Sequence, residues 1–369
     1  MKMPSEVLRE EILRDRVISF ERFMEIALYC PETGYYETEK DIVGRGGDFI
    51  TSVSVGSLFG ELLAFQFAEW LAELKIQSEP LKIVEAGAHD GKLAGDILHW
   101  LQMHRPQLYS GIEYWILEPS LKRQSWQQET LRAFAPRVRW TAKVRSIVPA
   151  RRQFGGIIFS NELLDAFPVR RFGWDAAGKN WFEWGVTLAG GTFDWVKISL
   201  LPPALPASLR HLPSPLLQVL PDGYTIEDSP GAAGWWHEAA GVLSHGKLLA
   251  IDYGFTAEEQ LSPARTNGTL RAYHRHQVSA DLLANPGAQD LTAHVNFTAI
   301  QNAGVAAGLT TEHFCTQPQF LTRILQKSVG QNSSASLNAR QVRQFQTLTH
   351  PEHLGRAFRV LVQSRAVGE

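Results

Sequence analysis

Cysteine is nearly absent from this sequence, which has only Cys30 and Cys315 among its 369 residues. Two cysteines so far apart make neither a disulfide framework nor a zinc site, so we expect a reduced protein. Long apolar runs are also missing: no segment approaches about 18 uninterrupted apolar residues, and we predict no association with a membrane. Residues 1–16 carry acidic as well as basic side chains, unlike a secretory signal or a transit peptide, and we predict a cytoplasmic protein.

Neither positive nor negative charge predominates in the sequence. The 36 basic and 38 acidic side chains give a formal net charge of −2, and no block of like charges forms a tail. We therefore predict that the protein binds no nucleic acid. What the sequence does have is apolar content, 44% of its residues, which supports the core of one large domain with insertions or of two domains.

The most informative stretch is residues 81–95, LKIVEAGAHDGKLAG. It begins with a short apolar run typical of a buried parallel strand, which Glu85 closes. Gly87 and Gly91 predict a tight turn, and the apolar spacing of residues 92–103 predicts a helix. An open α/β sheet builds a nucleotide crevice from such parts, because glycines let a ligand approach the backbone and the helix start offers free N–H groups.

The same turn narrows the choice of nucleotide. A dinucleotide fingerprint requires glycine at positions 87, 89 and 92, but His89 and Lys92 stand at the last two. An acid followed by Gly-x-x-x-Gly suits S-adenosylmethionine instead, because that ligand has no pyrophosphate and Glu85 would attract its ammonium group. A glycine turn in an α/β domain without any nucleotide is the alternative for this stretch taken alone.

Strands and helices alternate along most of the chain, which predicts an α/β fold with a parallel sheet covered by helices on both faces. Residues 168–200 instead alternate apolar and polar side chains between turn signals, a pattern that predicts antiparallel hairpins. We predict N-terminal helices and a glycine-rich lid loop (1–78), the first part of a ligand-binding domain (79–167), inserted hairpins with a proline-rich subdomain (168–243), and the remainder of the sheet with C-terminal helices (244–369).

Acidic side chains follow the predicted parallel strands: Glu85 after the first, Glu118 after the second, and Glu162 with Asp165 after the fourth. The carboxyl ends of parallel strands are where an open sheet places its site. Glu118 could accept hydrogen bonds from both hydroxyls of a ribose. The alternative for Glu118 is a solvated acid at a strand-to-helix corner.

The segment Asn161–Asp165, NELLD, narrows the substrate. Enzymes that methylate base amines carry two prolines and an aromatic residue here, whereas this chain has Leu163 and Leu164, which argues against base methylation. Two carboxylates can hold a guanidinium and orient one nitrogen towards a methyl donor, so we predict catalytic roles for Asn161, Glu162 and Asp165. The alternative is that Glu162 caps the following helix and Asp165 faces solvent.

The glycine-rich segment 44–52 allows two interpretations. Glycines around polar groups suit a lid that opens and orders, which would bring Gly47, Asp48, Thr51 and Ser52 to the ligand. The alternative is a surface connector that aromatic residues hold against the core.

Histidines give little support for a metal. His274 and His276 are two residues apart, so they would face the same way on a strand and could bind a metal ion. No third or fourth ligand is evident nearby, since His294 lies far along the chain. We therefore predict no metal site.

Several stretches resemble, in their order along the chain, the MidA-like methyltransferases. This is the family of the mitochondrial complex I assembly factor that methylates arginine. The match runs from about Ile18 to the C-terminus, and the stretches that carry it are PETGYYETEKDIVGRGGDFITS, FGELL, IVEAGAHDGKLAGDIL, SNELLDAFPVRRF, AIDYG, GTLRAYHRHQ and PGAQDLTAHVNF.

The resemblance implies a class I, Rossmann-like methyltransferase sheet with an antiparallel last strand, an N-terminal helical extension and an inserted β-rich subdomain. It also implies S-adenosylmethionine as the methyl donor. The cofactor-binding residues that we predict are Glu85, Gly87, His89, Gly91, Glu118, Gly47, Asp48, Thr51 and Ser52.

This sequence departs from the family at two points. Members usually have Gly-Pro-Gly-Arg-Gly where this chain has Gly87-Ala88-His89-Asp90-Gly91, so the His89 side chain must turn away or fill part of the cofactor cleft. Members also tend to have Ser-Pro-Glu after the threonine of the GDFIT loop, and here Ser54 stands where the acid is expected.

We expect a methyltransferase that acts on a protein, with arginine of a respiratory complex I subunit or an analogous partner as the substrate that the resemblance implies. One alternative is a non-catalytic assembly or binding protein with a degenerate cofactor site. Another is a small-molecule methyltransferase. The sequence does not decide the oligomeric state.

Overall fold

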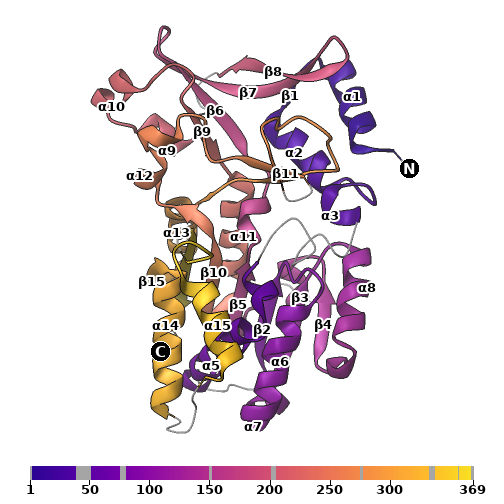
Figure 1. Ribbon diagram of the computed structural model, residues 1–369, viewed down its shortest axis with the longest axis vertical. Coiled ribbons are helices and arrows are strands. Elements are labelled where there is room, and N and C mark those ends of the chain that lie inside the picture. The colour runs from indigo at the N-terminus through magenta and orange to yellow at the C-terminus, as the bar shows by residue number, and fades with distance from the viewer. Residues whose placement is uncertain are drawn as a thin grey trace. The chain divides into compact units, whose positions relative to one another are not determined.

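The computed structural model describes residues 2–38, 51–74, 80–148, 152–200, 205–274, 277–331, 337–355 and 357–366. The chain forms two compact units, and Figure 1 labels most of their elements. The hairpin unit comprises Met1–Glu39, Asp165–Ala233 and Phe255–Ala299, and the sheet unit comprises Lys40–Leu164, Gly234–Gly254 and Ile300–Glu369. Both units therefore draw on the predicted segments 1–78 and 244–369.

The sheet unit is built on a mostly parallel sheet with the strand order β15-β16-β10-β5-β2-β3-β4. Its strands are β2 (Leu81–Ala86), β3 (Ile112–Leu117), β4 (Val138–Thr141), β5 (Phe154–Asn161), β10 (Leu243–Phe255), β15 (Thr310–Thr316) and β16 (Phe358–Arg365). Strands β4, β3, β2, β5 and β10 pair in parallel, and β16 is antiparallel to both of its neighbours. This confirms the predicted α/β class with an antiparallel last strand.

Helices cover the sheet of this unit. They are α4 (Ser52–Val55), α5 (Leu58–Glu73), α6 (Lys92–His104), α7 (Pro106–Gly111), α8 (Leu121–Thr130), α14 (Gln317–Gln331) and α15 (Ala339–Thr349). Helices α5, α6 and α14 share one apolar core with β2, β3, β5 and β16. In that core the ring of Phe67 lies 5.0 Å from the ring of Phe159, and burying one such side chain stabilises the fold by roughly 1.5–3 kcal/mol.

The hairpin unit contains a sheet with the order β1-β7-β6-β9, to which β8 adds by pairing with β7, and a second sheet with the order β12-β11-β13. The strands are β1 (Ile18–Ser19), β6 (Arg170–Asp175), β7 (Asn180–Ala189), β8 (Thr192–Ser199), β9 (Thr225–Asp228), β11 (Arg271–His274), β12 (Gln277–Ser279) and β13 (Asp290–Thr292). The predicted antiparallel hairpins are confirmed. Pairing of β1 with β7 explains why the N-terminal residues group with the insertion.

The helices of this unit are α1 (Pro4–Asp15), α2 (Phe20–Tyr29), α3 (Tyr35–Thr38), α9 (Ala207–Arg210), α10 (Ser214–Val219) and α12 (Ala257–Gln260). Helices α11 (Pro230–Gly241) and α13 (Phe297–Ala306) and strand β14 (Val295–Asn296) lie at or across the boundaries between the units. Within the described ranges, no helix is long and apolar enough to cross a membrane.

Candidate functional site

The glycine turn joins β2 to α6 and requires both of its glycines. Gly87 has φ +76°, and a Cβ there would lie 2.9 Å from Cδ1 of Leu163. Gly91 has φ +86°, and a Cβ there would lie 3.2 Å from Cδ1 of Leu131. The turn closes with a hydrogen bond of 2.7 Å from the Gly91 N–H to the Ala88 carbonyl, as the sequence predicts. Side chains would fill the space that these glycines leave beside the backbone.

His89 adopts a backbone conformation that is typical of glycine. Its φ is +47°, in the left-handed region that costs a residue with a Cβ about 1–2 kcal/mol. The side chain is 29% exposed, and its Nδ1 lies 3.8 Å from Oδ1 of Asp90. The backbone carbonyl accepts a hydrogen bond of 2.9 Å from Nε2 of Gln127. The turn thus carries backbone strain at His89.

Glu85 lies near the end of β2 and is buried. Its Oε2 accepts a hydrogen bond of 2.6 Å from the hydroxyl of Tyr114 on β3. Burial raises the pKa of the Glu85 carboxyl group to about 8, although the bond from Tyr114 acts in the opposite direction. The contact of Glu85 with an ammonium group stays a prediction.

Glu118 follows β3 directly and is 1% exposed, so it is not the solvated corner residue of the alternative interpretation. Its Oε1 accepts a bond of 2.9 Å from the Ser120 N–H and lies 3.2 Å from Nη2 of Arg123. Its Oε2 accepts a bond of 3.3 Å from Nε2 of Gln127. These partners fix the direction of both carboxylate oxygens at the carboxyl end of the sheet.

Glu162 follows β5 with a φ of +51°, a second left-handed residue at this edge of the sheet. Its Oε1 accepts hydrogen bonds of 3.0 Å from Nδ2 of Asn161 and of 3.2 Å from the Ser52 N–H. Burial raises the pKa of the Glu162 carboxyl group to about 8, the bond from Asn161 opposes that shift, and the charge of Asp252 adds to it. Strained residues of this kind gather at functional sites.

Asp252, near the end of β10, anchors the loop that carries Glu162. Its Oδ2 accepts hydrogen bonds from the N–H groups of Leu163 at 3.1 Å and of Leu164 at 2.7 Å. No catalytic or binding role is predicted for Asp252 from the sequence, although the residue lies in AIDYG, one of the stretches that resemble the family. The signal that identified Glu85 and Glu118, an acid near the carboxyl end of a predicted parallel strand, also applies to Asp252.

The end of the glycine-rich segment lies beside Glu162. Thr51 caps α4 with Ser54: Thr51 Oγ1 accepts the Ser54 N–H at 3.2 Å, and Ser54 Oγ accepts the Thr51 N–H at 3.0 Å. Ser54, which stands where the family acid is expected, therefore completes a capping box. The Ser52 N–H donates to Glu162. Gly47 and Asp48, with most of the predicted lid, lie outside the described residues.

Asp165 belongs to the hairpin unit, whereas Glu162 belongs to the sheet unit. The Asp165 carbonyl accepts a hydrogen bond of 3.0 Å from the Ala293 N–H. Burial raises the pKa of the Tyr36 hydroxyl group, and the charge of Asp165 adds to that shift. The same hydroxyl group donates a hydrogen bond of 2.8 Å to Oδ1 of Asp290. The pairing of Asp165 with Glu162 on one ligand stays a prediction.

The histidine pair gives no sign of a metal centre in the part of the chain that the structure describes. His274 Nδ1 lies 2.6 Å from the Ala288 carbonyl oxygen, and His276 is outside the described residues. Among the described residues, no group of three or more His, Cys, Asp or Glu side chains could hold a metal ion.

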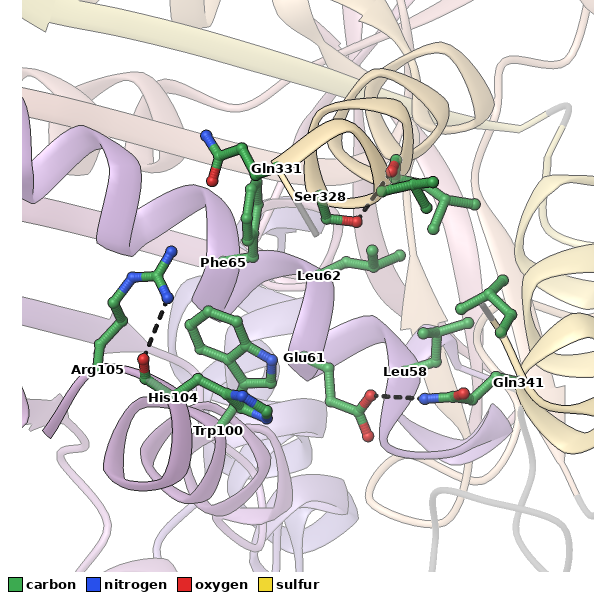
Figure 2. Close-up of a pocket in the computed structure, with 13 residues that line it drawn as sticks. Leu58, Glu61, Leu62, Phe65, Trp100, His104, Arg105, Ser328, Gln331 and Gln341 are labelled. Atoms are coloured by element: carbon green, nitrogen blue, oxygen red, sulfur yellow. Dashed lines mark hydrogen bonds between the residues drawn. The ribbon is translucent and has the colours of Figure 1, made fainter. Parts of the chain in front are cut away.

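A pocket of about 220 Å³ lies between helices α5, α6, α14 and α15 of the sheet unit (Figure 2). Leu62, Phe65 and Trp100 form much of its wall, and a hydrogen bond of 3.1 Å from Gln341 to Glu61 lies at its edge. Trp100 and His104 belong to the C-terminal half of α6, a helix about 20 Å long whose other end follows Gly91. The pocket is therefore distinct from the glycine turn.

The chain is similar to known proteins over most of its length. Residues 62–315 match the model of a family described as "Putative S-adenosyl-L-methionine-dependent methyltransferase". The Danio rerio protein "Protein arginine methyltransferase NDUFAF7, mitochondrial" is 28% identical over 95% of this chain and 84% of its own length. The Homo sapiens protein of the same name is 27% identical over 92% of this chain and 78% of its own.

A solved structure is also similar. A crystal structure of a superfamily member from Burkholderia thailandensis, bound to S-adenosyl-homocysteine, has a TM-score of 0.82 and 32% sequence identity. The alignment covers 99% of this chain and 92% of that chain. The similarity thus includes both units and not the nucleotide-binding motif alone.

The relatives correct the predicted location. Their names describe mitochondrial proteins, so the prediction of a cytoplasmic protein is contradicted. That prediction rested on the mixed charges of residues 1–16 and on the scarcity of cysteine. Neither observation identifies a compartment, and similarity over 95% of the chain is the stronger evidence.

Proposed function

Because the chain belongs to this family of S-adenosyl-L-methionine-dependent methyltransferases, we propose that it methylates the guanidinium group of an arginine in a protein. Family membership confirms the resemblance found in the sequence motifs and S-adenosylmethionine as the cofactor. The names of the relatives support arginine as the acceptor. The observation that carries the proposal is the carboxyl group of Glu162, which follows β5 on a residue with a strained, left-handed backbone conformation.

The residues at this edge of the sheet fit the cofactor, which supplies an electrophilic methyl group when it is bound. Gly87 and Gly91 allow the tight left-handed turn, with φ +76° and +86°, and Glu118 holds two oriented acceptor oxygens suited to a ribose. We assign the turn and Glu118 to cofactor binding. Glu85, His89, Thr51 and Ser52 are further candidates on the same sheet unit.

Glu162 suits the acceptor side of the reaction. A carboxylate binds a guanidinium through charge-assisted hydrogen bonds and so orients one nitrogen. The nitrogen that gains a methyl group must also release a proton. The positive charge of a bound guanidinium favours the ionised form of a neighbouring carboxyl group, so Glu162 would act as a carboxylate in the complex and would receive that proton. Asn161 and the Ser52 N–H would keep its Oε1 in place.

The partner that we propose is a protein, and the resemblance points to a subunit of respiratory complex I or an analogous protein. Asp165 stays a predicted catalytic residue because it is a carboxylate three residues after Glu162 in the chain.

The test is transfer of a tritiated methyl group from S-adenosylmethionine into an extract of cells that lack this protein. Purified wild-type protein should label the acid-precipitable protein fraction, and Glu162→Gln should lower the rate by roughly a hundred- to ten-thousandfold, the usual contribution of a general base. Enzyme-dependent label in a soluble compound other than S-adenosylmethionine, separated by chromatography, would mean a small-molecule methyltransferase. No enzyme-dependent label in protein or in such a compound, with cofactor bound, would mean a binding protein without turnover.

A further inference from the structure

Gln127 occupies a position between the two parts of the proposed cofactor site. It lies in α8 and is fully buried. Its Nε2 donates to the His89 carbonyl at 2.9 Å and to Glu118 Oε2 at 3.3 Å. Its Oε1 accepts a bond of 3.0 Å from Nε1 of Trp140 on β4. These partners fix the orientation of the amide, since a flipped amide would face two acceptors with its oxygen.

The hydrogen bond from Gln127 to the His89 carbonyl supports a strained part of the turn. His89 holds a left-handed conformation that residues with a Cβ rarely adopt, and such conformations persist only where neighbouring contacts determine them. A Cβ on Gly91 would lie 3.3 Å from the Gln127 Cα, so the backbone of α8 packs directly against the turn. Gln127 therefore contacts the turn through both its backbone and its side chain.

We propose that Gln127 is a positioning residue for the cofactor: its amide ties the Glu118 carboxylate to the glycine turn and holds the turn in shape despite His89. The proposal rests on the assignment of Glu118 and the turn to S-adenosylmethionine. It does not depend on arginine as the methyl acceptor. The chemistry is that of preorganisation, because a carboxylate and a turn that are already fixed relative to each other need no ordering when the ligand binds.

The sheet unit contains a matched control. Gln363 on β16 is also fully buried, and its Oε1 accepts a bond of 2.7 Å from Nε1 of Trp236. Its Nε2 donates to the Gln301 carbonyl and to Oγ1 of Thr311, both at 2.9 Å. Gln127 and Gln363 therefore have the same burial and similar partners, except that Gln363 donates to the hydroxyl group of Thr311 where Gln127 donates to the carboxylate of Glu118. The partners of Gln363 lie outside the proposed cofactor site.

The experiment compares Gln127→Met with Gln363→Met by calorimetric titration of S-adenosylhomocysteine, after circular dichroism has shown that both proteins are folded. Methionine keeps the volume and removes the amide. Gln127→Met should weaken binding by roughly ten- to a hundredfold, the range for losing buried hydrogen bonds to a charged group. Gln363→Met should stay within about twofold of wild type. Equal affinities of Gln127→Met and wild type would overturn the proposal.

Gln127→Glu provides an independent variant with the same shape. It would set a second carboxylate against Glu118 and the His89 carbonyl, so binding should be weaker than in Gln127→Met. If Gln127 only fills space, Gln127→Glu should bind like wild type.

The double variant Glu118→Ala/Gln127→Met separates the two assignments. The effect of Gln127→Met should shrink when Glu118 is absent, because the two residues act together. If Glu118→Ala alone leaves the affinity unchanged, the ribose assignment fails. If the effects add fully, the proposed link between Gln127 and Glu118 fails.

Discussion

Oδ2 of Asp252 accepts the backbone N–H of Leu164 at 2.7 Å, and this bond fastens the loop after β5 to the neighbouring strand β10. The Leu163 N–H donates to the same oxygen. The loop carries Glu162 in a left-handed conformation, so its shape depends on a carboxylate from another strand. Asp252 is in this way a structural requirement for the position of the proposed base.

Asp252→Asn should lower the free energy of unfolding by roughly 1.5–3 kcal/mol, because a buried anion that binds two N–H groups is lost. Methyl transfer should fall, while affinity for S-adenosylhomocysteine should change little, since Asp252 contacts neither the glycine turn nor Glu118 in any bond described above. The control is Asp175→Asn, because Asp175 also accepts two backbone N–H groups, those of Ala177 and Gly178, but lies in an exposed turn. Urea unfolding should show a change within about 0.5 kcal/mol for the control.

Glu118→Gln should weaken binding of S-adenosylhomocysteine by roughly tenfold or more, because the enclosed carboxylate is the proposed acceptor for the ribose hydroxyls. The control is Glu113→Gln on β3, the strand that Glu118 follows: Glu113 pairs with Lys82 and Arg139 and has no proposed part in the site. Calorimetry should find wild-type affinity for the control. Wild-type affinity in Glu118→Gln as well would remove Glu118 from the site.

Glu162 should make the protein less stable as the pH rises. Its pKa of about 8 in the folded state lies above the ordinary value of 4.5, so between these pH values the folded protein binds more protons than the unfolded chain. Stability is therefore lost as the pH rises through that window, by at most about 1.4 kcal/mol per pH unit.

Glu162→Gln removes this dependence, so the difference in unfolding free energy between variant and wild type should grow from pH 5 to pH 8. Glu85, whose pKa is raised in the same direction, is present in both proteins and cancels in the difference. Urea unfolding at several pH values measures this difference. A constant difference would show that the Glu162 carboxyl group titrates normally.

His89→Gly should leave the affinity for S-adenosylhomocysteine within about threefold of wild type, because the Gln127 bond goes to the backbone carbonyl and the imidazole is partly exposed. Glycine should be more stable than alanine at this position by about 1 kcal/mol, since only glycine adopts φ +47° without strain. Thermal unfolding of the two variants tests the second statement. Much tighter binding by His89→Gly would show that the imidazole intrudes on the cofactor.

The sequence predicted those features that depend on local patterns. Apolar runs located β2 and β5, the turn required Gly87 and Gly91, and acids near strand ends identified Glu85, Glu118 and Glu162. The alternation of residues 168–200 predicted the hairpins.

The features that the sequence did not predict depend on contacts between distant residues. The N-terminal residues join the sheet of the insertion because Ile18 pairs with Val186. No local sequence pattern predicts that register. The bonds of Gln127 to residues 89, 118 and 140 join three separate loops or strands. Ser54 stands where the family has an acid, and its hydroxyl group completes the capping box of α4 with Thr51. A single sequence gives the chemical types of such residues but not their partners.

The most direct measurement is identification of the residue that receives the methyl group. Wild-type protein and Glu162→Gln would each be incubated with trideuteromethyl-labelled S-adenosylmethionine and an extract from cells lacking the protein, and the digested proteins would be analysed by mass spectrometry. Labelled methylarginine in one or a few proteins, formed by wild type and abolished in Glu162→Gln, is the result that we predict. Label on lysine, histidine or carboxyl groups, or equal labelling of arginine by wild type and Glu162→Gln, would contradict the account.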